Sequence, residues 1–136
     1  KDLRGNIATI LNLLASIEEF EKNRVVKIRE KIETSLAEFI ESDKIDKNRL
    51  EQEMIFYLEK LDINEEKVRL AQHCKYFLDT MDNEEFAGKK LNFIAQEMGR
   101  EINTMGSKSN DADMQRIVVQ MKDNLEKIKE QVLNVL

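Results

Sequence analysis

The sequence has no proline, no tryptophan and only four glycines among its 136 residues. Proline and glycine are the residues least compatible with a helix interior, so a chain that avoids them is suited to long helices. Charged residues make up 36% of the sequence and aromatic residues 6%, a composition typical of helical proteins rather than of sheets or disordered chains. We therefore expect an all-α fold, and the length fits one helical domain spanning 1–136.

The sequence also lacks a second cysteine, a signal peptide and an apolar run of membrane length. Cys74 is the only cysteine, so no internal disulfide can form. A reducing cytoplasm with no membrane attachment is the expected location. The chain starts at Lys1 without a methionine and with a helix already under way, which suggests that it is part of a longer chain.

An excess of basic residues is absent as well. The chain carries 22 lysines and arginines against 27 aspartates and glutamates, a net charge of -5. The field of the whole molecule therefore repels nucleic acid. Any contact with RNA has to depend on a local patch of positive charge.

Both ends of the chain show apolar residues at alternating spacings of four and three, the pattern of a coiled-coil seam. The first seam consists of Leu3, Ile7, Ile10, Leu14 and Ile17. It breaks at Glu21 and Arg24, which indicates either one helix with a stutter or two helices meeting near Asn23. It then resumes out of phase as Val25, Ile28, Ile32, Leu36 and Phe39. The last seam consists of Met114, Val118, Met121, Leu125, Ile128, Val132 and Val135. The two seams can pair with each other as antiparallel helices or with a second subunit, and periodicity does not choose.

Three helices are expected between these ends. The predicted helix N-caps are Asp46, Asn64 and Asn83, whose side chains can accept a hydrogen bond from a free backbone N–H. Gly106 is predicted to end the third helix, since glycine is common at helix C-termini. The first of the three carries Leu50, Met54, Ile55, Leu58 and Leu61, and the third carries Leu91, Ile94, Met98, Ile102 and Met105. The predicted fold is an elongated bundle of about five helices with long, coiled-coil-like helices at both ends.

One line of charged residues on the third of these helices is not explained by packing. On an ideal helix the line falls within about 20° of a single direction and consists of Lys90, Glu97, Glu101 and, if the helix passes Gly106, Lys108. Two carboxylates at i and i+4 repel each other unless a cation offsets them. A shared Mg²⁺ or Mn²⁺, which prefers carboxylate oxygens, is one such cation. A solvated face salt-bridged to Lys90 and Arg100 explains the same spacing, and both readings stay open.

His73, the single histidine, has Glu66 and Arg69 on nearly the same face of the preceding helix. It is either a general acid or base or an ordinary surface histidine, because nothing near it in the sequence sets its pKa. Cys74 is expected in the core. The sequence contains no HExxH, paired CxxC, GxSxG or GxGxxG motif and no RNA-binding aromatic motif, so the familiar enzyme classes have no support.

The run Gly88 to Asp111, GKKLNFIAQEMGREINTMGSKSND, closely resembles the signature of the YicC family, G(K/R)(K/R)LDF..QE.NRE.NT.(G/A)SK. The resemblance extends to Glu53 to Leu70 and to Glu126 to Val135. Members of this family are bacterial endoribonucleases that depend on a divalent metal, form oligomers expected to be hexamers, and carry an additional N-terminal domain. The resemblance thus implies that this chain is the C-terminal region and that its N-terminal domain is missing here. The sequence departs from the pattern at Asn92, where aspartate is usual, and at Gly99, where asparagine is usual.

The resemblance implies a set of site residues and a divalent cation, Mg²⁺ or Mn²⁺, as cofactor. Glu97 and Glu101 are the expected metal ligands, with Glu66 as a further candidate. His73 is expected to transfer a proton. The expected contacts to the RNA phosphates are Arg69, Lys89, Lys90, Arg100, Asn103 and Lys108.

Two functions remain as alternatives. The first is a metal-dependent endoribonuclease, whose catalytic residues are His73, Glu97, Arg100 and Glu101 and whose partner is RNA. The second is a non-catalytic helical module that forms homo-oligomers and binds RNA or a protein. The unbroken seam from Met114 to Val135 motivates the second.

Overall fold

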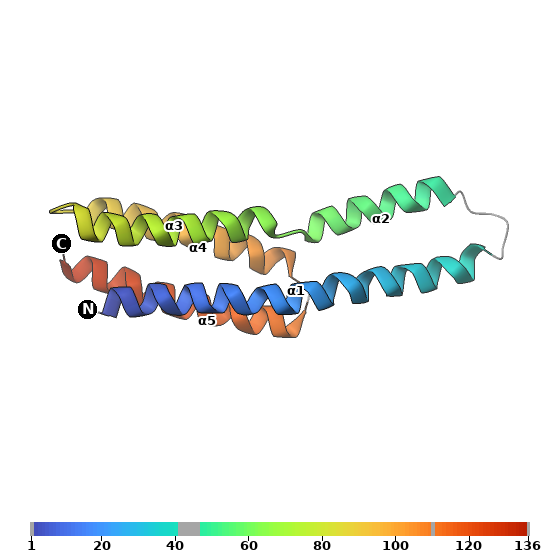
Figure 1. Cartoon of the computed structure of the whole chain (residues 1–136), viewed down its shortest axis with the longest axis horizontal. Helices are drawn as coiled ribbons and strands as arrows, with labels where there is room; N and C mark the ends of the chain where they lie inside the picture. Colours follow the sequence, from blue (N-terminus) through green and yellow to red (C-terminus); the bar gives the residue numbers. More distant parts are fainter. Residues whose placement is uncertain (1, 41–46, 110, 136) are drawn as a thin grey trace.

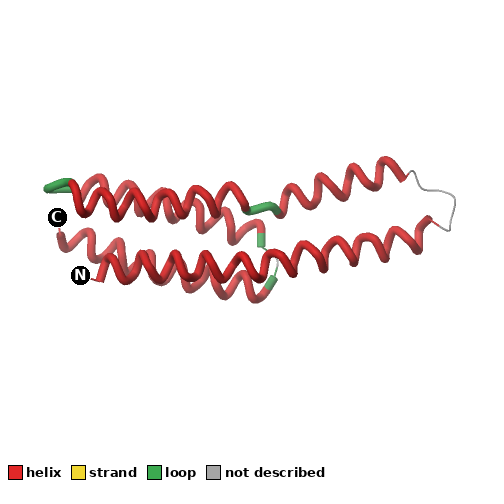
Figure 2. The backbone as a smooth tube through the Cα atoms, in the orientation of Figure 1, coloured by secondary structure: helices red, strands yellow, loops and turns green. Residues whose placement is uncertain are grey.

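The computed structural model describes residues 2–40, 47–109 and 111–135. These ranges contain five helices and no strand: α1 (Asp2–Ile40), α2 (Lys47–Leu61), α3 (Asn64–Asn83), α4 (Gly88–Lys108) and α5 (Ala112–Val135). Figure 1 shows that they form a long, narrow molecule, with both termini near one end. The tube in Figure 2 shows that short turns join α2 to α3 and α3 to α4. The predicted all-α elongated bundle is confirmed.

The first half of α1 forms a four-helix body with α3, α4 and α5. Within it α1 packs on α5 and α3, and α4 packs on α3 and α5, so the four helices close a ring. Neighbours run antiparallel, as the hydrogen bond from Asn6 Nδ2 to Gln131 Oε1 (3.2 Å) shows for the two ends of the chain. The two seams therefore pair with each other within one chain.

The core follows the predicted stripes. The seam residues Leu3, Ile7, Ile10, Leu14 and Ile17 of α1 are buried against Met114, Val118, Met121, Leu125, Ile128 and Val132 of α5. The five apolar residues predicted for α4 are buried as well. Together with buried apolar residues of α3, these stripes form one hydrophobic cluster that runs through the body.

The helix α2 and the second half of α1 extend from the body as a two-helix arm (Figure 1). The helix α1 continues through Asn23 without a break, which decides between the two alternatives for this segment. Glu21 and Arg24 keep the alternating spacing of the seam, and both side chains are turned inward, so the apolar stripe is interrupted by buried polar residues. In the arm Ile28 and Ile32 are half-buried, whereas Ile55, predicted in the α2 stripe, is exposed. The predicted cap Asp46 lies outside the described residues.

Three predicted helix boundaries were wrong. Asn64 is the first residue of α3, so the cap position belongs to Ile63. The backbone N–H of Asn64 donates to Asp62 Oδ1 at 2.9 Å. Asn83 ends α3 and donates back to the Asp79 carbonyl, and α4 begins only at Gly88. Gly106 does not end α4. A Cβ at this position would lie 3.1 Å from Val118 Cγ1, so glycine serves the close approach of α5.

Candidate functional site

Outside its apolar stripe, α4 presents two rows of residues that point in different directions. The α3-facing line consists of Lys90, Glu97, Glu101 and Lys108, and the helix does reach Lys108. The outer ridge points to solvent and consists of Lys89, Phe93, Gln96, Arg100 and Asn103. The predicted site residues are therefore spread over two faces of α4: Lys89, Arg100 and Asn103 lie on the ridge, and the carboxylates lie on the line.

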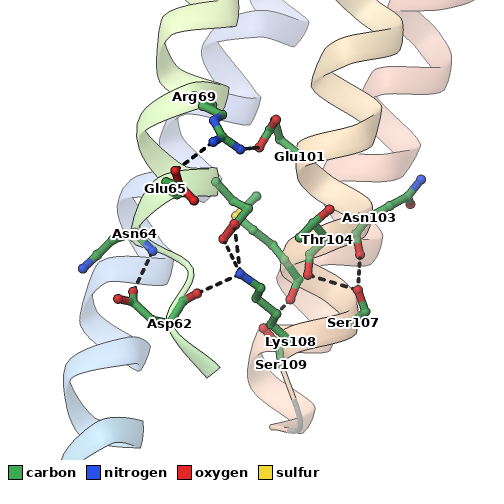
Figure 3. A network of polar contacts seen from close by, with 12 residues as sticks. Asp62, Asn64, Glu65, Arg69, Glu101, Asn103, Thr104, Ser107, Lys108 and Ser109 are labelled. Atoms are coloured by element: carbon green, nitrogen blue, oxygen red, sulfur yellow. Dashed lines mark hydrogen bonds and ion pairs between the residues drawn. The ribbon is translucent and has the colours of Figure 1, made fainter. Parts of the chain in front are cut away.

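Glu101 is the most enclosed carboxylate of the line, with 8% of its side chain exposed. Its cationic neighbour is Arg69 of α3, whose Nη1 lies 4.0 Å from Glu101 Oε2. That guanidinium is held by Glu65, which accepts a hydrogen bond from Nη2 at 2.8 Å (Figure 3). A separation of 4.0 Å is too long for a hydrogen bond, so the negative charge of Glu101 is offset only through space.

Glu97 lies one turn before Glu101 and is 26% exposed at its side chain. Arg100 Nη2 lies 3.9 Å from Glu97 Oε1, again beyond hydrogen-bonding distance. Among the described residues, both carboxylates of the i, i+4 pair therefore have a cation nearby but none within hydrogen-bonding distance. This arrangement leaves their oxygen lone pairs available to a further ligand.

Lys108 is held firmly at the end of the line, as Figure 3 shows. Its Nζ donates to Glu66 Oε1 at 3.0 Å, to Glu66 Oε2 at 3.2 Å and to the Asp62 carbonyl at 3.2 Å. The Glu66 side chain is buried, and its charge is neutralised by this lysine. Arg24 of α1 donates to the Lys108 carbonyl at 2.8 Å, which places a cation at the C-terminus of α4. Lys108 and Glu66 thus join the end of α4 to the start of α3.

A second buried ion pair lies beside this junction. Lys67 of α3 binds Glu18 at 2.8 Å and also Glu21, both from α1. Burial works to lower the pKa of Lys67, but the two carboxylates outweigh it and the pKa is raised. The hydrogen bond from Lys67 in turn lowers the pKa of Glu18. The polar break in the seam of α1 is therefore the place where α1, α3 and α4 are tied together.

Lys90 and Lys89, predicted to contact phosphate, differ in their surroundings. Lys90 donates to Glu84 Oε2 at 2.8 Å and lies 5.1 Å from the ring centre of Tyr76. Glu84 first, and then Tyr76, raise the pKa of Lys90. Lys89 is exposed and has no ion pair among the described residues. Of the two, Lys89 is the lysine whose charge is free to meet an anion.

His73 is half-buried on α3, one turn after Arg69. Helical geometry places it on the side of α3 that carries Arg69 and Glu66, the side that meets α4. Within the described part of the chain its ring makes no hydrogen bond, so neither nitrogen is committed to a protein partner. Cys74 is fully buried, as predicted, and burial raises the pKa of its thiol to about 12, which makes a nucleophilic role unsupported.

Comparison with known proteins supplies the family. The family described as "Endoribonuclease YicC-like, C-terminal" matches residues 17–136. The chain belongs to this family. A relative from Clostridioides difficile (strain 630), named "Probable endoribonuclease YicC", is 37% identical over 136 residues, which cover 99% of this chain and 46% of the relative. A relative of the same name from Haemophilus influenzae is 38% identical over 91 residues, covering 67% of this chain and 32% of the relative. The chain thus spans less than half the length of the relatives it matches.

Gly99, one of the two departures from the family signature, lies where α4 comes close to α5. A Cβ at this position would lie 3.1 Å from Leu125 Cδ2 of α5, tighter than an ordinary contact. An asparagine, the residue that the resemblance leads us to expect here, would require the Leu125 side chain to move by a few tenths of an ångström. The departure from the signature therefore accompanies a close approach of α4 and α5 in this chain.

The carboxylates present fit a hard divalent cation at one place. Glu97 and Glu101 offer oxygen ligands and are bound by no cation, whereas the Glu66 carboxylate is occupied by Lys108. Among the described residues no three histidine, cysteine, aspartate or glutamate side chains cluster as a metal site. A cation held by two carboxylates, with water and phosphate completing its shell, agrees with the habit of Mg²⁺.

Two residues near the site were not predicted from the sequence. Phe93 is 60% exposed in the middle of the outer ridge, although it lies inside the family signature. Its position opposite the apolar stripe of α4 could have identified it as an exposed aromatic. Lys129 of α5 lines a hollow beside the same side of α4, and spacing within the sequence could not have predicted this neighbour.

Of the helices in the described ranges, none has the length and apolarity needed to cross a membrane.

Proposed function

We propose that this chain is the helical part of an endoribonuclease that cleaves RNA phosphodiester bonds with the help of Mg²⁺ or Mn²⁺. The observation that carries the proposal is the pair Glu97 and Glu101, two carboxylates one turn apart, the second enclosed and neither hydrogen-bonded to a cation. The family and the names of its relatives support the RNA-cleaving class. The longer protein is expected to act in the cytoplasm.

In the proposed reaction a water or a ribose hydroxyl attacks the phosphorus, and the bond to the leaving ribose oxygen breaks. The cation, when bound, makes the phosphate more electrophilic and offsets its negative charge. Glu97 and Glu101 hold the cation in place. Arg100, which lies next to Glu97, stabilises the charge that develops on the phosphate oxygens. His73 takes the proton from the attacking hydroxyl or gives one to the leaving oxygen.

Arg69 has a positioning role in this proposal. Its guanidinium is held by Glu65 and faces Glu101 across the α3–α4 contact (Figure 3). A positive charge at this distance offsets the negative charge of Glu101 through space without occupying its oxygens.

Cleavage of labelled RNA by the full-length protein tests the proposal. With Mg²⁺ or Mn²⁺ the protein should cut, and EDTA should abolish the cutting. Glu97→Gln and Glu101→Gln keep the shape of the side chains but remove the charge, and each should lower the rate at least about a hundredfold. Glu130→Gln, at an exposed position of α5, is the matched control and should cut normally. Undiminished cutting by both site variants refutes the metal assignment.

One observation favours the second candidate, a non-catalytic module that assembles copies of itself and binds RNA or a protein. The arm exposes Val26, Ile55, Phe56 and Tyr57, and a hollow of about 800 Å³ lies at its base. Val26 and Ile55 line this hollow, and exposed apolar side chains at a hollow are typical of interaction surfaces. If the full-length protein forms a homo-oligomer, expected to be a hexamer, and binds RNA without ever cutting it, this candidate replaces the first.

A further inference from the structure

The outer ridge of α4 borders a hollow between α4 and α5. Its volume is about 370 Å³, and its lining residues are Gln96, Gly99, Arg100, Asn103, Thr104 and Lys129. The hollow lies beyond Arg100 from Glu97, on the side of α4 turned away from α3. It is therefore separate from the carboxylate pair but shares one residue, Arg100, with its surroundings.

Gly99 keeps the floor of the hollow open. An added Cβ at this position would lie 3.9 Å from Lys129 Nζ as well as against Leu125. The missing side chain thus leaves the ammonium group of Lys129 next to the backbone of α4. Two cations from different helices, Arg100 and Lys129, consequently line the same small space.

Each of these two cations has a carboxylate nearby but beyond hydrogen-bonding distance. Arg100 lies 3.9 Å from Glu97, and Lys129 lies 3.6 Å from Glu126. Neither separation is a hydrogen bond. Lys108, by contrast, donates to Glu66 at 3.0 Å. Both lining cations therefore keep their N–H donors available for another acceptor.

The rest of the lining suits an anion. Gln96 and Asn103 contribute side-chain amides, which can donate hydrogen bonds, and none of the residues lining the hollow is acidic. Two cations and two amides around a space of this size match the oxygens of one phosphate group. The net negative charge of the whole chain makes this local concentration of donors stand out.

Phe93 lies three residues before Gln96, one of the lining residues, and on the same exposed ridge. Its ring is mostly in water, and Lys89 stands one turn before it. An exposed aromatic ring beside a phosphate-sized cationic space is the pairing that a single nucleotide needs, because its base stacks on the ring while its phosphate is bound. A base inside a duplex has no free face to offer.

We propose that the α4–α5 hollow binds the phosphate of an unpaired RNA nucleotide whose base stacks on Phe93. The inference rests on the proposed function, since it names the part of the RNA that this face takes. Arg100 then lies between the bound phosphate and the carboxylate pair, so the nucleotide in the hollow positions the neighbouring part of the strand at Glu97.

Binding measured in EDTA separates this site from cleavage. The probes are a fluorescently labelled, unstructured RNA of about twelve nucleotides, a hairpin that presents unpaired nucleotides only in its loop, and a blunt duplex. Anisotropy titrations with the full-length protein are repeated over a salt series. The unstructured RNA and the hairpin loop should bind, and the duplex should bind at least about tenfold more weakly.

Two variants test the two halves of the site. Lys129→Gln should weaken binding about five- to tenfold and reduce the slope of log K against log salt by about 0.7, the value for one phosphate contact on a single strand. Phe93→Leu should weaken binding about tenfold with no change in that slope. Lys127→Gln, on the opposite side of α5, and Phe86→Leu, an exposed aromatic in the α3–α4 turn, are the matched controls and should bind normally.

The outcomes are distinct. If the protein cleaves RNA but Lys129→Gln and Phe93→Leu bind RNA as the unmodified protein does, the site is wrong and the proposed function stands. If the protein never cleaves RNA but both variants weaken binding as expected, the site stands and the nuclease proposal fails. Equal affinity for the duplex, unaffected by Phe93→Leu, overturns the stacking half of the inference.

Discussion

Replacing Lys108 by methionine distinguishes a structural lysine from a lysine that binds RNA. Methionine keeps most of the length and apolar stem of the side chain but removes its charge. The Glu66 side chain is only 3% exposed, so the substitution would leave a buried carboxylate without its cation. The hydrogen bond to the Asp62 carbonyl is lost as well.

The expected cost follows from this burial. Removing one partner of a buried ion pair typically costs about 3–5 kcal/mol. Because 32% of the Lys108 side chain is in contact with water, we expect a smaller loss of about 2–3 kcal/mol in the free energy of unfolding. Glu66→Gln should cost less, about 1–2 kcal/mol, since the unpaired ammonium group can turn toward water. The double variant should lose less than the sum, with a coupling energy of about 1–2 kcal/mol.

Urea denaturation followed by far-ultraviolet circular dichroism measures these free energies. The exposed pair Asp113 and Arg116 provides a matched cycle, because its members are also charged, one turn apart or less, and largely in water. That cycle should give a coupling energy below about 0.5 kcal/mol. If Lys108→Met unfolds like the unmodified protein but no longer binds RNA, the reasoning is refuted and Lys108 is a ligand-binding residue.

The remaining predictions concern other buried groups. Arg24→Met should lower the free energy of unfolding by about 1–2 kcal/mol, because the charged hydrogen bond to the Lys108 carbonyl is lost. Removing Nη1, which is buried without a partner, offsets part of this loss. Urea denaturation measures the change, and an unchanged midpoint would contradict the capping role. Cys74 should react with a thiol reagent at mildly alkaline pH about a thousandfold more slowly in the native protein than in urea, since a pKa raised to about 12 leaves little thiolate. Because the pKa of the unfolded thiol is near its ordinary value of 9.0 and burial raises that of the folded thiol, the contribution of Cys74 to stability is complete below pH 9.0 and is lost as the pH rises from there to about 12. Equal reaction rates in the two states would show that the thiol is accessible.

Much of the fold could be predicted from periodicity, because buried positions repeat with the pitch of the helix. The stripes of α4 and α5 and the first stripe of α1 were placed correctly on this basis alone. Caps were predicted less well. At the start of α3 both Asp62 and Asn64 have suitable side chains, and only the path of the turn decides that Asp62 reaches the free N–H.

The candidate site could be predicted only in part, for a related reason. Spacing shows which residues share a line on α4 but not which helix lies opposite. Lys108 belongs to the predicted line, yet Glu66, 42 residues away in sequence, takes its charge. Glu97 and Glu101 meet no such partner, and this difference appears only in three dimensions. Of the three carboxylates predicted as possible metal ligands, tertiary contacts therefore leave Glu97 and Glu101 as the loosely paired ones.

The proposed function depends on Glu97 and Glu101 holding a divalent cation together. Crystals of the full-length protein soaked in Mn²⁺ and measured near the manganese absorption edge test it most directly. An anomalous difference peak is expected between the two carboxylates, and it should be lost in Glu101→Gln crystals treated in the same way. A peak bound only by other residues, or none at saturating Mn²⁺, would contradict it.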